Sequence, residues 1–189
     1  MSLSKDTNYI VSGLERSGTS LMMQILKVSG IPISYDINKK EDIHNPNGYY
    51  ELSNGKIIDD LMKLEYREIY GNKGKFIKVT AYGIKYLPKD CKFEVIFMDR
   101  NVDEIIESME KKSMNKYDYE KSRDLLLKLR NFTLKYLRDN KIPYMIISYN
   151  GLVNENSDKM DLHLLKQKYD VDVEKALKVI DRRLYRNRK

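Results

Sequence analysis

A glycine-containing loop near the N-terminus has the residue types and spacing of an anion-binding site. Residues 9–12 (YIVS) favour a strand, residues 13–20 read GLERSGTS, and apolar residues at helical spacing follow. Glycines permit a tight turn, and the backbone N–H groups of such a loop attract an anion, as does the dipole of the next helix. The sequence therefore predicts a phosphate cradle between a strand and a helix.

The loop nearly fits the nucleotide-binding P-loop pattern, G-x-x-x-x-G-K-[S/T]. Gly13, Gly18 and Ser20 match it, but Thr19 stands where the P-loop has a lysine. That lysine neutralises the outer phosphates of ATP or GTP, so its absence argues against an ordinary NTPase. Positive charge comes instead from Arg16, inside the loop.

A second candidate phosphate ligand lies downstream. Residues 93–98 (FEVIFM) predict a buried strand, Arg100 follows it, and Ser108 comes eight residues after Arg100. Asn101 is a favourable helix N-cap, with Glu104 at the spacing of a capping box. The helix that follows should bury one stripe and leave Ser108 off it: Val102, Ile105, Ile106 and Met109. The arginine fork is well suited to a phosphate group.

Together these motifs resemble those of the sulfotransferase family. In that family, a basic residue followed by S-G-T-[S/T] holds the 5′-phosphosulfate of 3′-phosphoadenosine 5′-phosphosulfate (PAPS). An arginine after a strand and a serine eight residues later contact its 3′-phosphate. The resemblance covers residues 9–26, 76–88, 93–109 and 144–153. It implies that PAPS binds without a metal ion at Gly13, Arg16, Ser17, Gly18, Thr19, Ser20, Arg100 and Ser108. The alternative for Arg100 is a surface ion pair with Asp99 or Asp103.

The expected catalytic base of cytosolic sulfotransferases is missing. Their strand ends in K-T-H-L-P, in which the histidine is the base, whereas this chain keeps Lys78 but has Thr80 at the histidine position. A threonine cannot act as a base at neutral pH without help. Other branches of the family use a glutamate, and two tyrosines beside Glu51 could raise its pKa. The resemblance therefore implies Arg16, Lys78 and Glu51 as catalytic residues, with Asp36 and Glu41 as competing bases.

Composition narrows the classes of protein and ligand. The 189 residues predict one domain, residues 1–189, with 41% hydrophobic and 33% charged residues. The sequence has neither a signal-peptide pattern nor an apolar run long enough to span a membrane, which favours a cytoplasmic protein without membrane insertion. A single cysteine, Cys91, excludes an internal disulfide, and two distant histidines, His44 and His163, argue against a metal site.

The net charge of +7 comes in good part from a basic C-terminus, Lys178, Arg182, Arg183, Arg186, Arg188 and Lys189. Attraction of an anionic cofactor or an acidic substrate ranks first for these residues, and a solvated tail second. Nucleic acid ranks well below, because no nucleic-acid-binding motif is present.

Alternation of strand and helix patterns predicts the architecture that must position these residues. We expect an α/β, three-layer P-loop-type fold with a mostly parallel sheet of about five strands flanked by helices. The strands should lie near residues 9–13, 31–35, 76–80, 93–98 and 142–148, and later helices at 53–70, 117–140, 160–169 and 173–180. Arg16, Lys78, Arg100 and Tyr149 would then meet at the carboxyl edge of the sheet.

The resulting prediction is a PAPS-dependent sulfotransferase that modifies a hydroxyl or amine of an unknown small-molecule or glycan acceptor. Two alternatives stay open. A P-loop nucleotide kinase or phosphotransferase would explain the loop, and a non-catalytic nucleotide-binding relative would explain the missing histidine.

Overall fold

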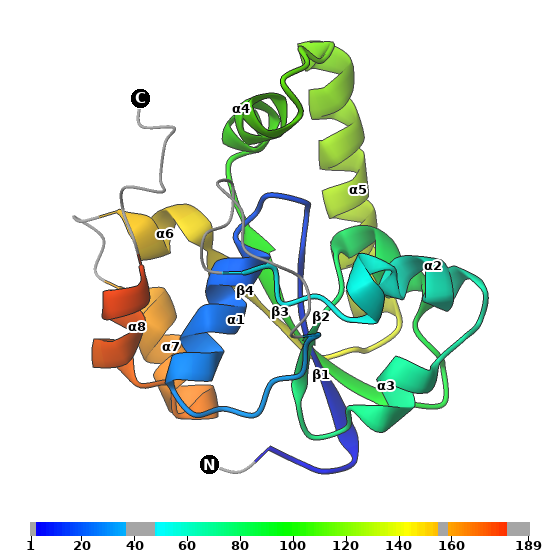
Figure 1. Ribbon diagram of the computed structural model, residues 1–189, viewed down its shortest axis with the longest axis vertical. Coiled ribbons are helices and arrows are strands. Elements are labelled where there is room, and N and C mark those ends of the chain that lie inside the picture. Colours follow the sequence, from blue (N-terminus) through cyan, green and yellow to red (C-terminus); the bar gives the residue numbers. More distant parts are fainter. Residues whose placement is uncertain (1–2, 37–47, 155–158, 181–189) are drawn as a thin grey trace.

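Four parallel strands form the central sheet of the computed structural model, which describes residues 3–36, 48–154 and 159–180. They are β1 (Thr7–Gly13), β2 (Phe76–Lys78), β3 (Lys92–Asp99) and β4 (Tyr144–Ser148), in the order β2-β1-β3-β4 (Figure 1). Val11 lies opposite Lys78 on one side and Ile96 on the other. Since all four strands run in the same direction, their carboxyl ends share one edge, as the sequence predicts.

The strand expected at residues 31–35 is wrong in extent. Ile33 forms a single parallel bridge with Phe76. The Ser34 N–H donates to the Phe76 carbonyl at 2.8 Å, and the Phe76 N–H donates to the Pro32 carbonyl at 2.9 Å. Pro32 has no N–H with which to continue the ladder towards the N-terminus, and on the other side the Asp36 N–H donates to the Glu51 carbonyl at 2.8 Å. The described part of the sheet therefore has four strands, against about five expected.

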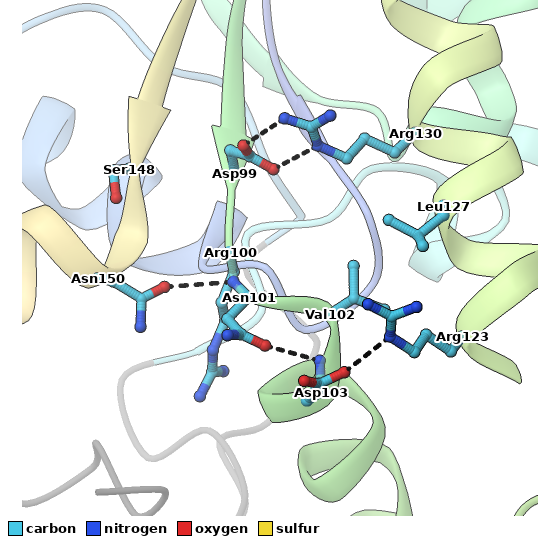
Figure 2. Close-up of a pocket in the computed structure, with 10 residues that line it drawn as sticks. All are labelled: Asp99, Arg100, Asn101, Val102, Asp103, Arg123, Leu127, Arg130, Ser148 and Asn150. Carbon is cyan, nitrogen blue, oxygen red and sulfur yellow. Dashed lines mark hydrogen bonds and ion pairs between the residues drawn. The ribbon is translucent and has the colours of Figure 1, made fainter. Parts of the chain in front are cut away.

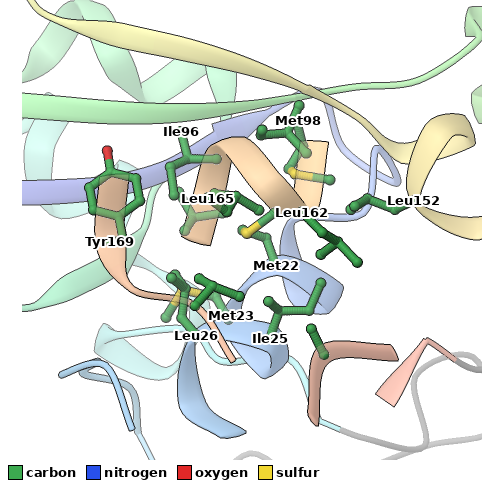
Figure 3. Packing of buried hydrophobic residues seen from close by; sticks show 14 of the residues in the cluster. Met22, Met23, Ile25, Leu26, Ile96, Met98, Leu152, Leu162, Leu165 and Tyr169 are labelled. Atoms are coloured by element: carbon green, nitrogen blue, oxygen red, sulfur yellow. The ribbon is translucent and has the colours of Figure 1, made fainter. Parts of the chain in front are cut away.

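Helices cover both faces of the sheet and make the three expected layers (Figure 1). One face carries α1 (Thr19–Val28), α6 (Tyr149–Val153), α7 (Met160–Tyr169) and α8 (Val173–Val179). Opposite them lie α2 (Ile57–Met62), α4 (Val102–Ser113), α5 (Tyr119–Asp139) and the 3₁₀ helix η2 (Ala81–Tyr86). Strand side chains alternate between two apolar clusters, so Val11 joins the first and Ile10 the second. Figure 3 shows the first cluster, where Met22 of α1 packs with Leu162 of α7.

Two helix predictions need correction. The helix expected at 53–70 is divided into the 3₁₀ helix η1 (Ser53–Gly55), α2 and α3 (Arg67–Gly71), and Leu64 between the last two is left-handed, with φ of 64°. Asn101 caps α4 as expected, because its Oδ1 accepts from the Asp103 N–H at 2.8 Å. Glu104 does not complete a capping box; its carboxylate binds Arg100 and Asn150.

The remaining predicted helices at 117–140, 160–169 and 173–180 are confirmed as α5, α7 and α8. Within the described ranges, every helix is too short or too polar to cross a membrane.

Candidate functional site

The loop between β1 and α1 packs tightly against the neighbouring strand β3. A Cβ on Gly13 would lie 2.5 Å from the Met98 carbonyl oxygen and 2.4 Å from Ser17 Oγ, so a side chain has no room there. Within the loop, the Ser17 N–H donates to the Leu14 carbonyl at 3.1 Å. Arg16 has a φ of 66°, a left-handed conformation that is uncommon without glycine and frequent at functional loops.

The far end of the loop packs on an aromatic ring. Gly18 has a φ of 98°, and a Cβ there would lie 2.3 Å from Cδ2 of Tyr149, which directly follows β4. Helix α1 begins at Thr19, and the N–H groups in the first turn of a helix have no acceptor inside it. These groups and the helix dipole make the end of the loop favourable for an anion.

Two of the predicted ligands, Arg100 and Ser108, contact a third, Arg16. Arg100 Nη1 donates to the Arg16 carbonyl at 3.0 Å, and Arg16 Nε donates to Ser108 Oγ at 3.1 Å. Arg16 lies 84 residues from Arg100 and 92 from Ser108 in the sequence. The fold thus assembles two basic side chains and a hydroxyl beside the glycine loop.

Arg100 is held in place from several sides. Its side chain is only 7% exposed, its Nε lies 3.0 Å from Glu104 Oε2, and its guanidinium stacks 4.4 Å from the centre of the Tyr149 ring. The second carboxylate oxygen of Glu104 accepts from Asn150 Nδ2 at 2.7 Å. Burial raises the pKa of Tyr149, which keeps its ring neutral beside the guanidinium at neutral pH.

The alternative of a surface ion pair for Arg100 is wrong about its exposure, because the side chain is 7% exposed, and the carboxylate 3.0 Å from its Nε is that of Glu104. Asp99 binds Arg130 through two hydrogen bonds, of 2.6 and 2.8 Å, and Asp103 pairs with Arg123 at 3.3 Å. Both pairs flank a pocket of about 300 Å³ at the carboxyl ends of β3 and β4 (Figure 2). Its lining is mostly polar: Asp99, Arg100, Asn101, Val102, Asp103, Arg123, Leu127, Arg130, Ser148 and Asn150. Arg100 therefore borders both the glycine loop and a polar hollow beside it.

The predicted catalytic residues Glu51 and Lys78 form an ion pair on the β2 side of the loop. Lys78 Nζ lies 3.1 Å from Glu51 Oε1, and the lysine side chain is 6% exposed. The same nitrogen donates to the Tyr49 carbonyl at 2.5 Å and to Ser20 Oγ at 3.4 Å. A lysine therefore stands beside the first turn of α1, although Thr19 replaces the lysine of the P-loop pattern.

Thr80, at the histidine position of the family, and Asp36, one of the competing bases, both make structural hydrogen bonds. Thr80 precedes η2, and its carbonyl accepts from the Gly83 N–H at 2.9 Å. Asp36 Oδ2 accepts from the Asn54 N–H at 2.7 Å. Glu41 lies outside the described residues, as do five of the basic C-terminal residues, Arg182, Arg183, Arg186, Arg188 and Lys189.

Sequence reasoning missed the supports of Arg100 and the role of Tyr49. The spacing of Arg100 and Glu104, four residues apart, is that of a helical ion pair and could have indicated the first. No sequence pattern could have indicated the role of Tyr49, because the group that accepts from Lys78 is its backbone carbonyl. Across the described residues, no three or more His, Cys, Asp and Glu side chains are grouped so that they could hold a metal ion.

Comparison with known proteins gives structural likenesses alone, among them a distant one to a sugar kinase. No protein-family model matches the chain, and no curated protein matches it. An unliganded sugar kinase from Janibacter sp. HTCC2649 is 14% identical with a TM-score of 0.46, over 92% of this chain and 98% of that one. A likeness of this size carries no conclusion about activity. The function therefore has to be inferred from the residues of the loop and its neighbours.

Proposed function

We propose that this chain is a PAPS-dependent sulfotransferase. The observation that carries the proposal is the convergence of Arg100 and Ser108 on Arg16. PAPS has a phosphate at the 3′ position and a phosphosulfate at the 5′ position. Arg100 and Ser108 would bind the first, and residues 13–20 would bind the second. Two separate sets of ligands, the loop for the 5′ group and Arg100 with Ser108 for the 3′-phosphate, support PAPS. A nucleotide with a single phosphate chain would need only one set.

The donors around the loop fit such a ligand. Two guanidinium groups and the first turn of α1 supply positive charge, and the glycines at positions 13 and 18 let the loop pack closely against Met98 and Tyr149. The Ser17 hydroxyl is fully buried and has no hydrogen-bond partner among the described residues. Buried polar groups are rarely left in that state, and they call for explanation at a binding loop.

Each residue then has a role in group transfer. PAPS supplies the activated sulfuryl group. Arg16 and the N–H groups at the start of α1 would stabilise negative charge on the departing phosphate, and Lys78 would stabilise charge near Ser20. Glu51 would accept the proton of the acceptor hydroxyl or amine, since Thr80 cannot. Catalysis of this kind depends mainly on positioning and electrostatics.

A nucleotide kinase or phosphotransferase is the second candidate, and one contact favours it. Lys78 Nζ lies 3.4 Å from Ser20 Oγ, so this lysine could serve the outer phosphates of ATP in place of the missing P-loop lysine. Such an enzyme would require Mg²⁺ and would have no need of the buried Arg100. A non-catalytic nucleotide-binding relative would keep the loop and lack turnover.

Calorimetric titration separates these possibilities. The ligands are adenosine 3′,5′-bisphosphate, its isomer ADP, and ATP with Mg²⁺; the proteins are wild type, Arg100→Ala and the control Arg123→Ala. Arg123 lines the same pocket, and its replacement changes the net charge by the same amount as that of Arg100. Its side chain, however, is 48% exposed. We expect the 3′,5′-bisphosphate to bind most tightly and Arg100→Ala to weaken it by about 10- to 100-fold, the value of a charge-assisted hydrogen bond.

The control should change that affinity by less than about threefold, as expected of an exposed charge. Preference for ATP with Mg²⁺, or equal effects of the two substitutions, would reject the sulfotransferase and favour the phosphotransferase. Binding of none of the three nucleotides would reject both enzymes.

A further inference from the structure

A backbone carbonyl lies where the loop should receive a ligand. The Tyr49 carbonyl oxygen accepts from Lys78 Nζ at 2.5 Å and from Ser20 Oγ at 3.3 Å. One donor stands at the end of β2, and the other lies in the first turn of α1. Ser20 and Lys78, 58 residues apart in the sequence, therefore point hydrogen-bond donors at one oxygen of residues 48–54, which we call the strap.

These donors are better matched to an anion than to a peptide group. Lys78 is an ammonium with 5% of its residue surface exposed, and a helix N-terminus adds further positive potential. The Tyr49 carbonyl carries only a partial negative charge. Glu51, two residues further along the strap, supplies the full charge through its ion pair with Lys78 at 3.1 Å. The strap thus provides from within the chain both the oxygen and the charge that a tetrahedral oxyanion would bring.

We propose that the Tyr49 carbonyl oxygen occupies the position of an oxygen of the group to be transferred, and that the strap closes the site in the free protein. An incoming sulfuryl or phosphoryl group has to displace the Tyr49 carbonyl of the strap from Lys78 and Ser20, which also releases Glu51 from Lys78 for its proposed role as the base. This inference rests on the proposed function to the extent that the loop binds an activated nucleotide. It holds equally for a sulfuryl and a phosphoryl donor, because both present tetrahedral oxyanions.

The strap is anchored by Leu52, which is buried in the second apolar cluster, and by Tyr50, whose ring lies 4.8 Å from that of Tyr35, but its backbone is unfavourable. Asp36 binds it twice: its N–H donates to the Glu51 carbonyl at 2.8 Å, and its carboxylate accepts from the Asn54 N–H at 2.7 Å. Tyr50, Ser53 and Asn54 all have left-handed φ angles, of 52°, 53° and 52°. Residues other than glycine disfavour this conformation, so the closed strap persists only through its contacts. The strain at these residues lowers the cost of exchanging the contacts of the strap for those of a ligand.

Hydrogen exchange followed by mass spectrometry tests the displacement on the whole chain. The Asn54 amide donates to Asp36, and the Gly55 and Lys56 amides just after the strap donate to the strap carbonyls of Leu52 and Ser53. Saturating PAPS without acceptor should accelerate their exchange, whereas ligands ordinarily slow exchange at the surfaces that they cover. Adenosine 3′,5′-bisphosphate has no sulfuryl group and should leave it unchanged. Unchanged or slower exchange with PAPS, or equal acceleration by both nucleotides, would overturn the assignment.

A variant outside the phosphate site should increase the affinity for PAPS, whereas damage to the fold would lower it. Asp36→Ala removes the carboxylate that holds Asn54 and should populate the open strap, so that PAPS binds about three- to tenfold more tightly. Asp59→Ala, which removes an exposed acid from α2, controls for the change in net charge. Affinity no greater than that of the control would refute the strap.

The strap and the proposed function can fail separately. PAPS binding with an unresponsive strap would reject the strap alone. Acceleration of strap exchange by ATP with Mg²⁺ instead of PAPS would retain the strap and favour the phosphotransferase. Binding of neither nucleotide would reject both inferences.

Discussion

Replacement of Gly18 by alanine should show how tightly the glycine loop depends on the segment after β4. The added Cβ would lie 2.3 Å from Cδ2 of Tyr149, far inside normal carbon–carbon contact. The Tyr149 residue is 9% exposed and belongs to the first apolar cluster, so its ring cannot simply swing into solvent. The φ of 98° at Gly18 is also unfavourable for alanine.

The two effects can be given separate magnitudes. A left-handed conformation costs alanine about 1–2 kcal/mol relative to glycine. Forcing extra volume into a packed core costs a further 1–3 kcal/mol or so. Gly18→Ala should therefore lower the free energy of unfolding by about 2–5 kcal/mol. In a domain of this size that corresponds to a fall in Tm of roughly 4–20 °C.

Gly30→Ala is the matched control, because Gly30 has a φ of 74° and a Cβ there would meet nothing within 4 Å. It should cost only the backbone contribution of about 1–2 kcal/mol. Urea unfolding of the wild type and both variants at pH 7 measures the difference. The double variant Gly18→Ala/Tyr149→Ala removes the clash. Its loss in unfolding free energy should therefore be smaller than the sum of the losses measured for the single variants Gly18→Ala and Tyr149→Ala. Equal destabilisation by Gly18→Ala and Gly30→Ala would refute the packing argument.

Two further predictions concern other parts of the chain. Burial, followed by the hydrogen bond from its hydroxyl to Glu94, raises the pKa of Tyr169 above the ordinary value of 10.0. Its contribution to stability is therefore complete below about pH 10 and lost as the pH rises further, and urea midpoints across this range should fall less steeply in Tyr169→Phe. Arg130→Ala leaves Asp99, 27% exposed, without its two-bond partner and should cost about 1–3 kcal/mol by urea unfolding. Lys128→Ala, in an ion pair in which the lysine is 71% exposed, should cost less than about 0.5 kcal/mol; equal losses would contradict this ranking.

Features that depend on a few neighbouring residues could be predicted from the sequence. The glycine loop, the parallel α/β pattern and the N-cap at Asn101 all follow from local spacing, and each is present. The placement of Arg100 and Lys78 at strand ends is present for the same reason. Predictions that needed more than local pattern were less accurate. Residues 31–35 have strand-like composition but only one bridge, and the helical pattern of 53–70 does not reveal the left-handed Leu64.

Partners of the site residues were decided by the tertiary structure. The sequence predicts that Arg16 and Arg100 lie at one edge of the sheet, but it does not show that Arg100 donates to the Arg16 carbonyl or that Arg16 Nε donates to Ser108 Oγ. Nor does it show that Lys78 reaches the Tyr49 carbonyl, because backbone groups have the same chemistry at every position. Residue types and short spacings thus determined which chemistry the chain can offer. Long-range packing decided which donors meet, because hydrogen bonds and ion pairs require contact within about 3 Å and sequence separation sets no such distance.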